Sequence, residues 1–152
     1  MSVTAVQAIT GSGGLMYLAS TATALSTVSM IAVTATNVKS LLSGSMVYSA
    51  TSSVSISAAS STFQCLISAY TTNDPQLTAQ TSTIGGAFWV QNAVKVTSTA
   101  NTIKWCYIGD TGGAFYIENS MLTDSGGSTF SYNAAVTGGA ITCKSCSKID
   151  LT

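Results

Sequence analysis

The chain has 152 residues, a net charge of zero and only 7% charged residues. It contains no arginine and no histidine, and its lysines are scattered. This argues against a nucleic-acid partner, because such binding relies on clustered Lys and Arg. No apolar run approaches the ~20 residues of a membrane-spanning helix, so we expect no membrane span. The length fits one domain with a sizeable core.

The two ends of the sequence do not read as the ends of a domain. Residues 1–12 have the pattern of the last part of a preceding structural unit, and the sequence stops partway through another one at Ile149 and Leu151. No positively charged region precedes the N-terminal apolar residues, so no signal peptide is recognised. We therefore expect residues 1–152 to be a single segment of a longer chain.

A short motif led by glycine recurs along the chain. Loose copies occupy 13–20 and 44–51, clear copies occupy 85–92 and 112–119, and a shortened copy occupies 138–145. The later copies recur about every 26 residues, a spacing typical of solenoid repeats. The glycine suits a turn that needs a positive φ angle.

Each copy alternates with period two, as a short strand with one buried face does. The third and fifth residues after the first glycine are mostly apolar and predict the core face. The fourth forms a predicted outward row of aromatic residues, a possible contact face: Tyr17, Tyr48, Trp89 and Tyr116, followed by Thr142. The seventh is polar throughout and predicts a ladder of turn residues: Ser20, Thr51, Asn92, Asn119 and Ser145.

Weaker alternations between these copies leave room for two more strands in each unit. They occur near 54–56, 94–96 and 121–122, and again at 62–66, 102–106 and 129–133. Three short strands per unit predict an all-β fold, a right-handed parallel β-helix of about four to five coils of roughly 26 residues. Strands are expected at 21–23 and 29–33, with a helix over 19–33 as the alternative. The segment 67–84, which contains Asn73-Asp74-Pro75, predicts a loop insertion that is either neutral or functional.

One stretch resembles a known family. Phe130-Ser131-Tyr132-Asn133 followed by Gly138-Gly139-Ala140-Ile141 is similar to the paired FxxN and GGAI repeats of polymorphic outer-membrane protein passengers. More broadly, it resembles the pectin-lyase-like β-helices of secreted and surface proteins. The complete pair occurs once, and the glycine half recurs over residues 13–152. The resemblance implies a surface-exposed stalk or adhesion module and carries over no catalytic residue.

The cysteines allow two interpretations. Cys65 and Cys106 each lie 21 residues after the first glycine of their unit, so stacked coils would bring them together as a disulfide or as two small core residues. Cys143 and Cys146 form a lone CxxC at the end of a predicted strand. Without a second CxxC or a histidine, this motif does not predict a zinc site.

The charged residues do not form a catalytic set. The acids are spread over turns and strand faces: Asp74, Asp110, Glu118, Asp124 and Asp150. A glycosidase needs two carboxylates that face one cleft, and a serine nucleophile needs a base. We therefore expect no enzymatic activity, no cofactor and no metal site in this segment.

The preferred hypothesis is a non-enzymatic extracellular or cell-surface structural module: a stalk, a filament subunit or an adhesion surface. Expected partners are further coils of the same chain or a second copy, end to end, and also glycans. The alternative is a carbohydrate-active β-helix protein that binds polysaccharide, or a lyase or hydrolase whose catalytic residues lie outside the segment. In the predicted register, Phe115→Asp should prevent folding, whereas Glu118→Lys on the outer face should be nearly neutral.

Overall fold

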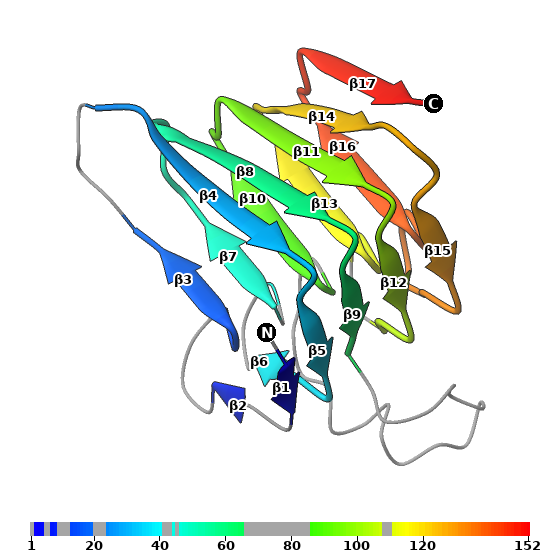
Figure 1. Cartoon of the computed structure of the whole chain (residues 1–152). Helices are drawn as coiled ribbons and strands as arrows, with labels where there is room; N and C mark the ends of the chain where they lie inside the picture. The colour runs from blue at the N-terminus through cyan, green and yellow to red at the C-terminus, as the bar shows by residue number, and fades with distance from the viewer. Residues whose placement is uncertain are drawn as a thin grey trace.

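The protein is a parallel β-solenoid of about four turns, seen in a computed structural model that describes residues 2–4, 7–8, 13–19, 24–40, 44, 46–65, 86–107 and 111–152. The described residues contain strands and turns and no helix, so the predicted fold class is confirmed. Three five-stranded parallel sheets run along the solenoid, one strand from each sheet per coil, with a further two-stranded sheet beside them (Figure 1). Right-handedness and a coil length of about 26 residues stay predictions.

The first sheet, here called the aromatic sheet, contains the strands that follow the glycine motifs. Its members are β3 (Met16–Leu18), β7 (Val47–Ser49), β10 (Phe88–Gln91), β13 (Phe115–Glu118) and β16 (Ile141–Lys144). The long-strand sheet follows it in each coil. Its members are β4 (Ser26–Ile31), β8 (Val54–Ala59), β11 (Lys95–Thr99), β14 (Met121–Asp124) and β17 (Lys148–Leu151).

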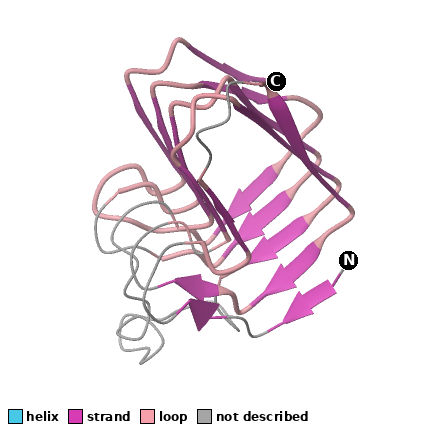
Figure 2. Cartoon of the chain, turned by 90° about the vertical axis from the view of Figure 1, so that its left-hand side faces the viewer, coloured by secondary structure: helices cyan, strands magenta, loops and turns pink. Residues whose placement is uncertain are grey.

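The third sheet, the short-strand sheet, closes each coil. Its members are β1 (Ser2–Thr4), β5 (Thr34–Thr36), β9 (Thr62–Gln64), β12 (Thr102–Lys104) and β15 (Thr129–Ser131). The remaining pair is β2 (Gln7–Ala8) and β6 (Lys39–Ser40). Figure 2 shows the strands of one sheet running side by side, with the coils stacked along the solenoid.

The strand pairing follows the repeat. In the aromatic sheet, Tyr17 pairs with Tyr48, Tyr48 with Trp89, Trp89 with Tyr116 and Tyr116 with Thr142. This is the register that the aligned glycine motifs predict. The long strand β4 lies where the helix over 19–33 was the alternative, so that alternative is wrong for the described part of this segment. The predicted insertion at 67–84 lies outside the described residues.

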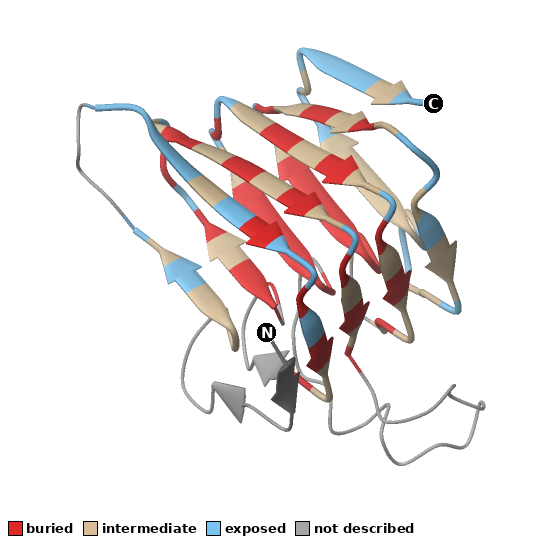
Figure 3. Cartoon of the chain, viewed as in Figure 1, coloured by how far each residue is buried: buried red, intermediate tan, exposed pale blue. Residues whose placement is uncertain are grey.

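The core lies between the three sheets, and the buried positions of neighbouring strands fall beside one another along the stack (Figure 3). Phe88 and Phe115 are fully buried, and their rings stack with centroids 4.8 Å apart. Phe63 packs edge-on against Phe88 at 5.0 Å, and Phe130 packs edge-on against Phe115 at 5.9 Å. Burial of each of the fully buried rings, those of Phe63, Phe88 and Phe115, contributes about 1.5–3 kcal/mol to the free energy of unfolding.

The two glycine positions of the clear motifs have different structural roles. The first adopts a positive φ angle, 71° at Gly112 and 63° at Gly138, a conformation that side chains disfavour. The second lies against the next coil, where a Cβ atom on Gly86 would overlap the carbonyl group of Gly113, and one on Gly113 would overlap that of Gly139. The Gly-Gly pair is therefore needed both to make the turn and to let the coils approach.

Candidate contact surfaces

The aromatic row of the aromatic sheet forms a ladder of stacked rings. The ring centroids of Tyr17 and Tyr48 lie 4.9 Å apart, those of Tyr48 and Trp89 4.5 Å apart, with each pair of planes 3° from parallel. Trp89 and Tyr116 continue the ladder at 5.9 Å and 7°. Because the rings stack along the solenoid axis, the rings of Tyr48 and Trp89 have a neighbouring ring on both faces.

Exposure along this ladder is uneven. Tyr17 is 59% exposed and Tyr48 is half-buried, whereas Trp89 and Tyr116 are 9% and 7% exposed. The expectation of an exposed row is therefore wrong for Trp89 and Tyr116. Burial, with a smaller contribution from the Tyr17 hydroxyl, raises the pKa of Tyr48 above its ordinary value. A contact surface on this ladder is thus confined to its N-terminal end, at Tyr17.

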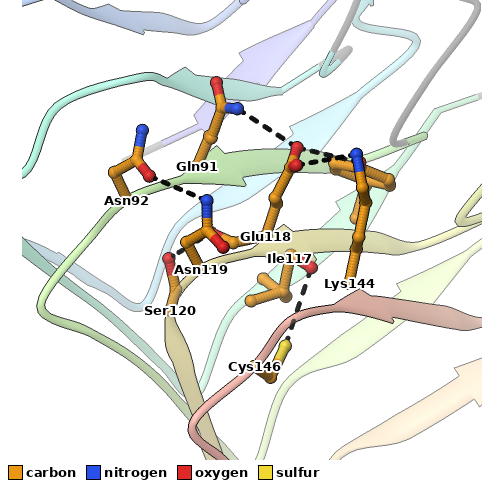
Figure 4. Close-up of polar contacts among 9 residues, drawn as sticks. Gln91, Asn92, Ile117, Glu118, Asn119, Ser120, Lys144 and Cys146 are labelled. Atoms are coloured by element: carbon orange, nitrogen blue, oxygen red, sulfur yellow. Dashed lines mark hydrogen bonds and ion pairs between the residues drawn. The ribbon is translucent and has the colours of Figure 1, made fainter.

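A charged cluster lies beside the other end of the ladder (Figure 4). Glu118 forms an ion pair with Lys144 at 2.9 Å and accepts hydrogen bonds from the Gln91 amide at 3.2 Å and the Tyr116 hydroxyl at 3.0 Å. The hydrogen bond from Lys144 is the main cause that holds the pKa of Glu118 below its usual value, and the same bond raises the pKa of Lys144.

This network revises the expected tolerance of Glu118. Gln91, Glu118 and Lys144 are level with one another in adjacent strands, so three successive coils are joined by their outward side chains. Glu118→Lys would place two ammonium groups in adjacent strands and remove the acceptor of three bonds. We therefore expect this substitution to be destabilising and not neutral.

The polar turn ladder is continuous over part of its length. The side-chain amide of Asn119 donates to the Oδ1 atom of Asn92 at 3.1 Å, one coil away. Asn92, Asn119 and Ser145 all adopt left-handed φ angles, 61°, 48° and 52°. Thr51 is buried and lies 3.4 Å from the Ser53 hydroxyl, in a turn of different length, and Ser20 lies outside the described residues.

Asn101 is a buried polar residue that sequence reasoning missed. It lies just before β12, is 1% exposed, and accepts a hydrogen bond from the Ser61 N–H at 2.9 Å through Oδ1. Its amide nitrogen donates to the Ala58 carbonyl at 2.8 Å and the Ser98 hydroxyl at 3.0 Å. Ser128, the equivalent residue one coil later, accepts from the Asn101 N–H at 3.1 Å. This corner of the solenoid is thus held by an internal polar ladder.

The asparagine of the FxxN motif has a comparable role. Asn133 accepts from the Cys106 N–H at 3.0 Å and donates to the Ile103 carbonyl at 2.9 Å, so it satisfies backbone groups of the preceding coil. The motif itself is the sequence signal for this residue. Asn101 has no such signal, because Ser61 and Ser128 occupy the equivalent positions in the coils on either side.

A disulfide joins Cys65 to Cys106, both fully buried, with Cα atoms 4.9 Å apart. Cys65 and Cys106 lie equally far from the first glycines of their units, but the strand register does not place them directly opposite each other. Gln64 pairs with Lys104, which places Cys65 level with Trp105 and one residue short of Cys106. The cause is an extra residue between β7 and β8, where the pairing changes from Ser49 with Val90 to Ser55 with Lys95.

The CxxC cysteines occupy the last described coil. Cys143 and Cys146 bring their Sγ atoms into contact, with Cα atoms 5.9 Å apart. Cys143 occupies the fifth position after the first glycine of its motif and pairs with Ile117 of the preceding coil. Cys146 comes directly after the turn at Ser145. Among the described residues, no three of His, Cys, Asp and Glu gather where they could hold a metal ion.

A small cavity lies beside the exposed end of the aromatic ladder. Its volume is about 170 Å³, and it is lined by Tyr17, Leu18, Ala19, Ser26, Val28, Thr51, Ser53 and Val54. It combines the Tyr17 ring and aliphatic side chains with the hydroxyl groups of one threonine and two serines. The site thus has the mainly apolar walls and few polar groups of small-molecule pockets, at a volume below the about 300–1,000 Å³ that such pockets have.

The described acids are distributed over separate places. Asp124 is buried and bonded to the Ser128 hydroxyl, Asp150 pairs with Lys148 at 3.0 Å, and Glu118 pairs with Lys144. Asp74 and Asp110 lie outside the described residues.

In the part of the chain that the structure describes, no helix is long and apolar enough to cross a membrane. Comparison with models of protein families, with curated proteins and with solved structures finds no match to this chain.

Proposed function

We propose that the chain is a non-enzymatic structural module that works outside the cell or at its surface, as a stalk, filament subunit or adhesion segment. The observation that carries this proposal is the continuity of stacking from coil to coil. Four kinds of contact extend from one coil to the next. They are the stacked phenylalanines of the core, the aromatic ladder, the buried hydrogen bonds at Asn101 and the ion pair of Glu118 with Lys144. Such a body gains length by adding coils and is suited to act as a rigid spacer.

The buried Cys65–Cys106 disulfide supports the extracellular location, because disulfides persist in oxidising compartments. The right-handed coil and the kinship with passengers that carry FxxN and GGAI repeats belong to the same proposal. The proposed location is tested by labelling intact cells that produce the protein with an antibody against residues 1–152, with permeabilised cells as the control. Equal labelling of intact and permeabilised cells is expected. Labelling that requires permeabilisation would contradict the proposal.

A second candidate function, polysaccharide binding, rests on the cavity beside Tyr17. An exposed aromatic ring next to the accessible hydroxyls of Ser26 and Ser53 matches the apolar face and hydroxyl rim of a sugar ring. The test is a binding screen of the full-length protein against neutral and acidic polysaccharides. Binding that is lost in Tyr17→Ala and kept in Tyr132→Ala, an exposed tyrosine elsewhere, would support this function. Turnover that depends on a residue within 13–152 would overturn the non-enzymatic proposal.

A further inference from the structure

We propose that Trp89, Tyr116 and Glu118 form a one-electron redox site, at which an oxidising radical takes an electron and the electron vacancy comes to rest on Tyr116. The partner is a small one-electron oxidant, an inorganic or organic radical. The three residues lie on β10 and β13, each of which pairs with a further strand on either side, so the site is interior to the stack. This activity goes beyond the proposed structural function and does not rest on it.

The two rings of the site are stacked in a way that suits electron transfer. Trp89 and Tyr116 pair across adjacent strands, and their ring centroids lie 5.9 Å apart with planes 7° from parallel. Face-to-face overlap of this kind brings the π electrons of the two rings together. Indole and phenol rings also give up a single electron far more readily than phenyl rings, so the stacked phenylalanines of the core do not compete with them.

A proton acceptor is in place at Tyr116. A phenol that loses an electron becomes strongly acidic, and it settles as a neutral phenoxyl radical only when its proton leaves. The Tyr116 hydroxyl donates a hydrogen bond to the Glu118 carboxylate at 3.0 Å, a distance at which a positioned base accepts a proton. The hydrogen bond from Lys144 holds the pKa of Glu118 below its usual value, so this carboxylate is ionised at neutral pH and able to accept.

The direction of transfer follows from the indole nitrogen. The Nε1 atom of Trp89 is buried, and it has no hydrogen-bond partner among the residues that the structure describes. An oxidised Trp89 therefore keeps its proton and remains a radical cation, which is a stronger oxidant than the neutral indole radical. Because Tyr116 can release its proton and Trp89 cannot, the vacancy moves from the indole to the phenol.

Each step balances in electrons and protons. The oxidising radical takes one electron from Trp89 and is itself reduced by one electron. Tyr116 then passes one electron to Trp89 and its hydroxyl proton to Glu118, which leaves a restored indole, a phenoxyl radical and a protonated carboxyl group. One electron from a soluble phenol, which is oxidised in turn and loses its proton to water, returns Tyr116 to its phenol form as Glu118 gives the proton back.

Two other side chains have the same ring types without the complete set of groups. Tyr48 stacks on Trp89 at 4.5 Å, but no carboxylate accepts a hydrogen bond from its hydroxyl in the described part of the chain. Trp105 also has a buried Nε1 atom, but the Lys104 ammonium lies 4.6 Å over its ring, and this positive charge opposes the loss of an electron. Tyr48 lies outside the site and is therefore the matched control for Tyr116.

The test uses the whole 152-residue chain carrying Trp105→Phe, in which Trp89 is the only tryptophan. Tyr116→Phe, Tyr48→Phe and Glu118→Gln are each added to this reference chain, and circular dichroism establishes that each variant is folded at the temperature of the assay. Pulse radiolysis in azide solution generates the azide radical, which oxidises indole in preference to phenol. Time-resolved absorption then follows the indole and phenoxyl radicals, whose visible bands differ.

The expected signature is transfer from indole to phenol within one molecule. In the reference chain, the indole radical should decay at the rate at which the phenoxyl radical appears, and this rate should not depend on protein concentration. Tyr48→Phe should leave both signals unchanged, whereas Tyr116→Phe should abolish the phenoxyl signal and prolong the indole radical. Glu118→Gln should slow the transfer several-fold, and the reference chain should be slower in deuterium oxide, because the proton moves with the electron.

Three kinds of result would overturn the proposal. An indole radical in the reference chain that decays without phenoxyl formation would show that the stacked pair transfers no electron. A phenoxyl radical that persists in Tyr116→Phe, or is lost in Tyr48→Phe, would place the final radical elsewhere. A rate unaffected both by Glu118→Gln and by deuterium oxide would remove the carboxylate from the site, and this result is decisive even if Tyr116→Phe misfolds. Surface labelling of cells is independent of all three, so this proposal and the proposed function fail separately.

Discussion

Replacement of Asn101 by alanine tests the internal polar ladder most sharply. The substitution removes the acceptor of the Ser61 N–H and the donor to the Ala58 carbonyl, both at a corner where the Asn101 side chain is buried. The Ser61 N–H left buried without a partner costs about 1–3 kcal/mol. The Ala58 carbonyl lies in β8, which is paired on both sides, so loss of its bond from Asn101 adds about 0.5–1.5 kcal/mol. The two together predict a loss of about 1.5–4.5 kcal/mol in the free energy of unfolding. The Ser98 hydroxyl keeps its contact with Ser128 and adds little.

The assay is urea unfolding followed by circular dichroism, with Asn119→Gly as the control. Glycine tolerates the left-handed φ of 48° at this position, and only one exposed hydrogen bond to Asn92 is lost. The control should therefore cost well under the Asn101→Ala value, at about 0.5–1 kcal/mol. If Asn101→Ala were as mild as the control, the buried ladder would not support the corner, and the reasoning would be refuted.

Three further predictions use the core, the disulfide and the ion pair. Phe115→Ala should lower the free energy of unfolding by about 3–5 kcal/mol and Val136→Ala, at 80% exposure, by less than about 0.5 kcal/mol, both by urea unfolding; equal losses would place Phe115 outside the core. Reduction of the Cys65–Cys106 disulfide, which closes a 41-residue separation, should cost about 4 kcal/mol by the chain-entropy relation, measured as the shift in urea midpoint with and without reductant; an unchanged midpoint would contradict the cross-link. Glu118→Gln should lower the unfolding temperature at neutral pH and match the parent in strong acid. Because the Glu118 pKa is lowered in the folded state, its stabilisation is present above the unfolded pKa of about 4.3 and is lost as the pH falls through the folded value; a difference that persists in acid would refute the ion-pair origin.

The strand order and the register of the aromatic sheet could be predicted because glycine and alternation repeat together. Gly112 and Gly138 mark the turns, and the apolar positions that follow them fall on one face of a strand. These signals are local, and parallel in-register stacking carries them from coil to coil. That is why the pairing of Trp89 with Tyr116 follows from the sequence.

Features that depend on turn length or on burial could not be predicted in the same way. One extra residue between β7 and β8 shifts the register, so Cys65 does not stack level with Cys106 although the two are bonded. Burial of Trp89 depends on what packs against the outer face, which alternation does not encode.

Several turns also use residues that give no turn signal. Ala32, Ser60 and Ala100 adopt φ angles of 52°, 49° and 50° after the long strands. Trp105 and Tyr132 do the same after the short strands, at 56° and 54°. Residues other than glycine rarely adopt a left-handed φ angle unless the surrounding structure imposes it. The stacking of the coils, and not the local sequence, therefore determines these turns.

The measurement that tests the account most directly is non-reducing peptide mapping of the protein isolated from its native source. Stacked coils in an oxidising compartment predict that the peptides carrying Cys65 and Cys106 are recovered as one linked species, which separates on reduction. Recovery of Cys65 and Cys106 as free thiols, or of either one linked to Cys143 or Cys146, would contradict the coil juxtaposition or the extracellular location on which the proposed function rests.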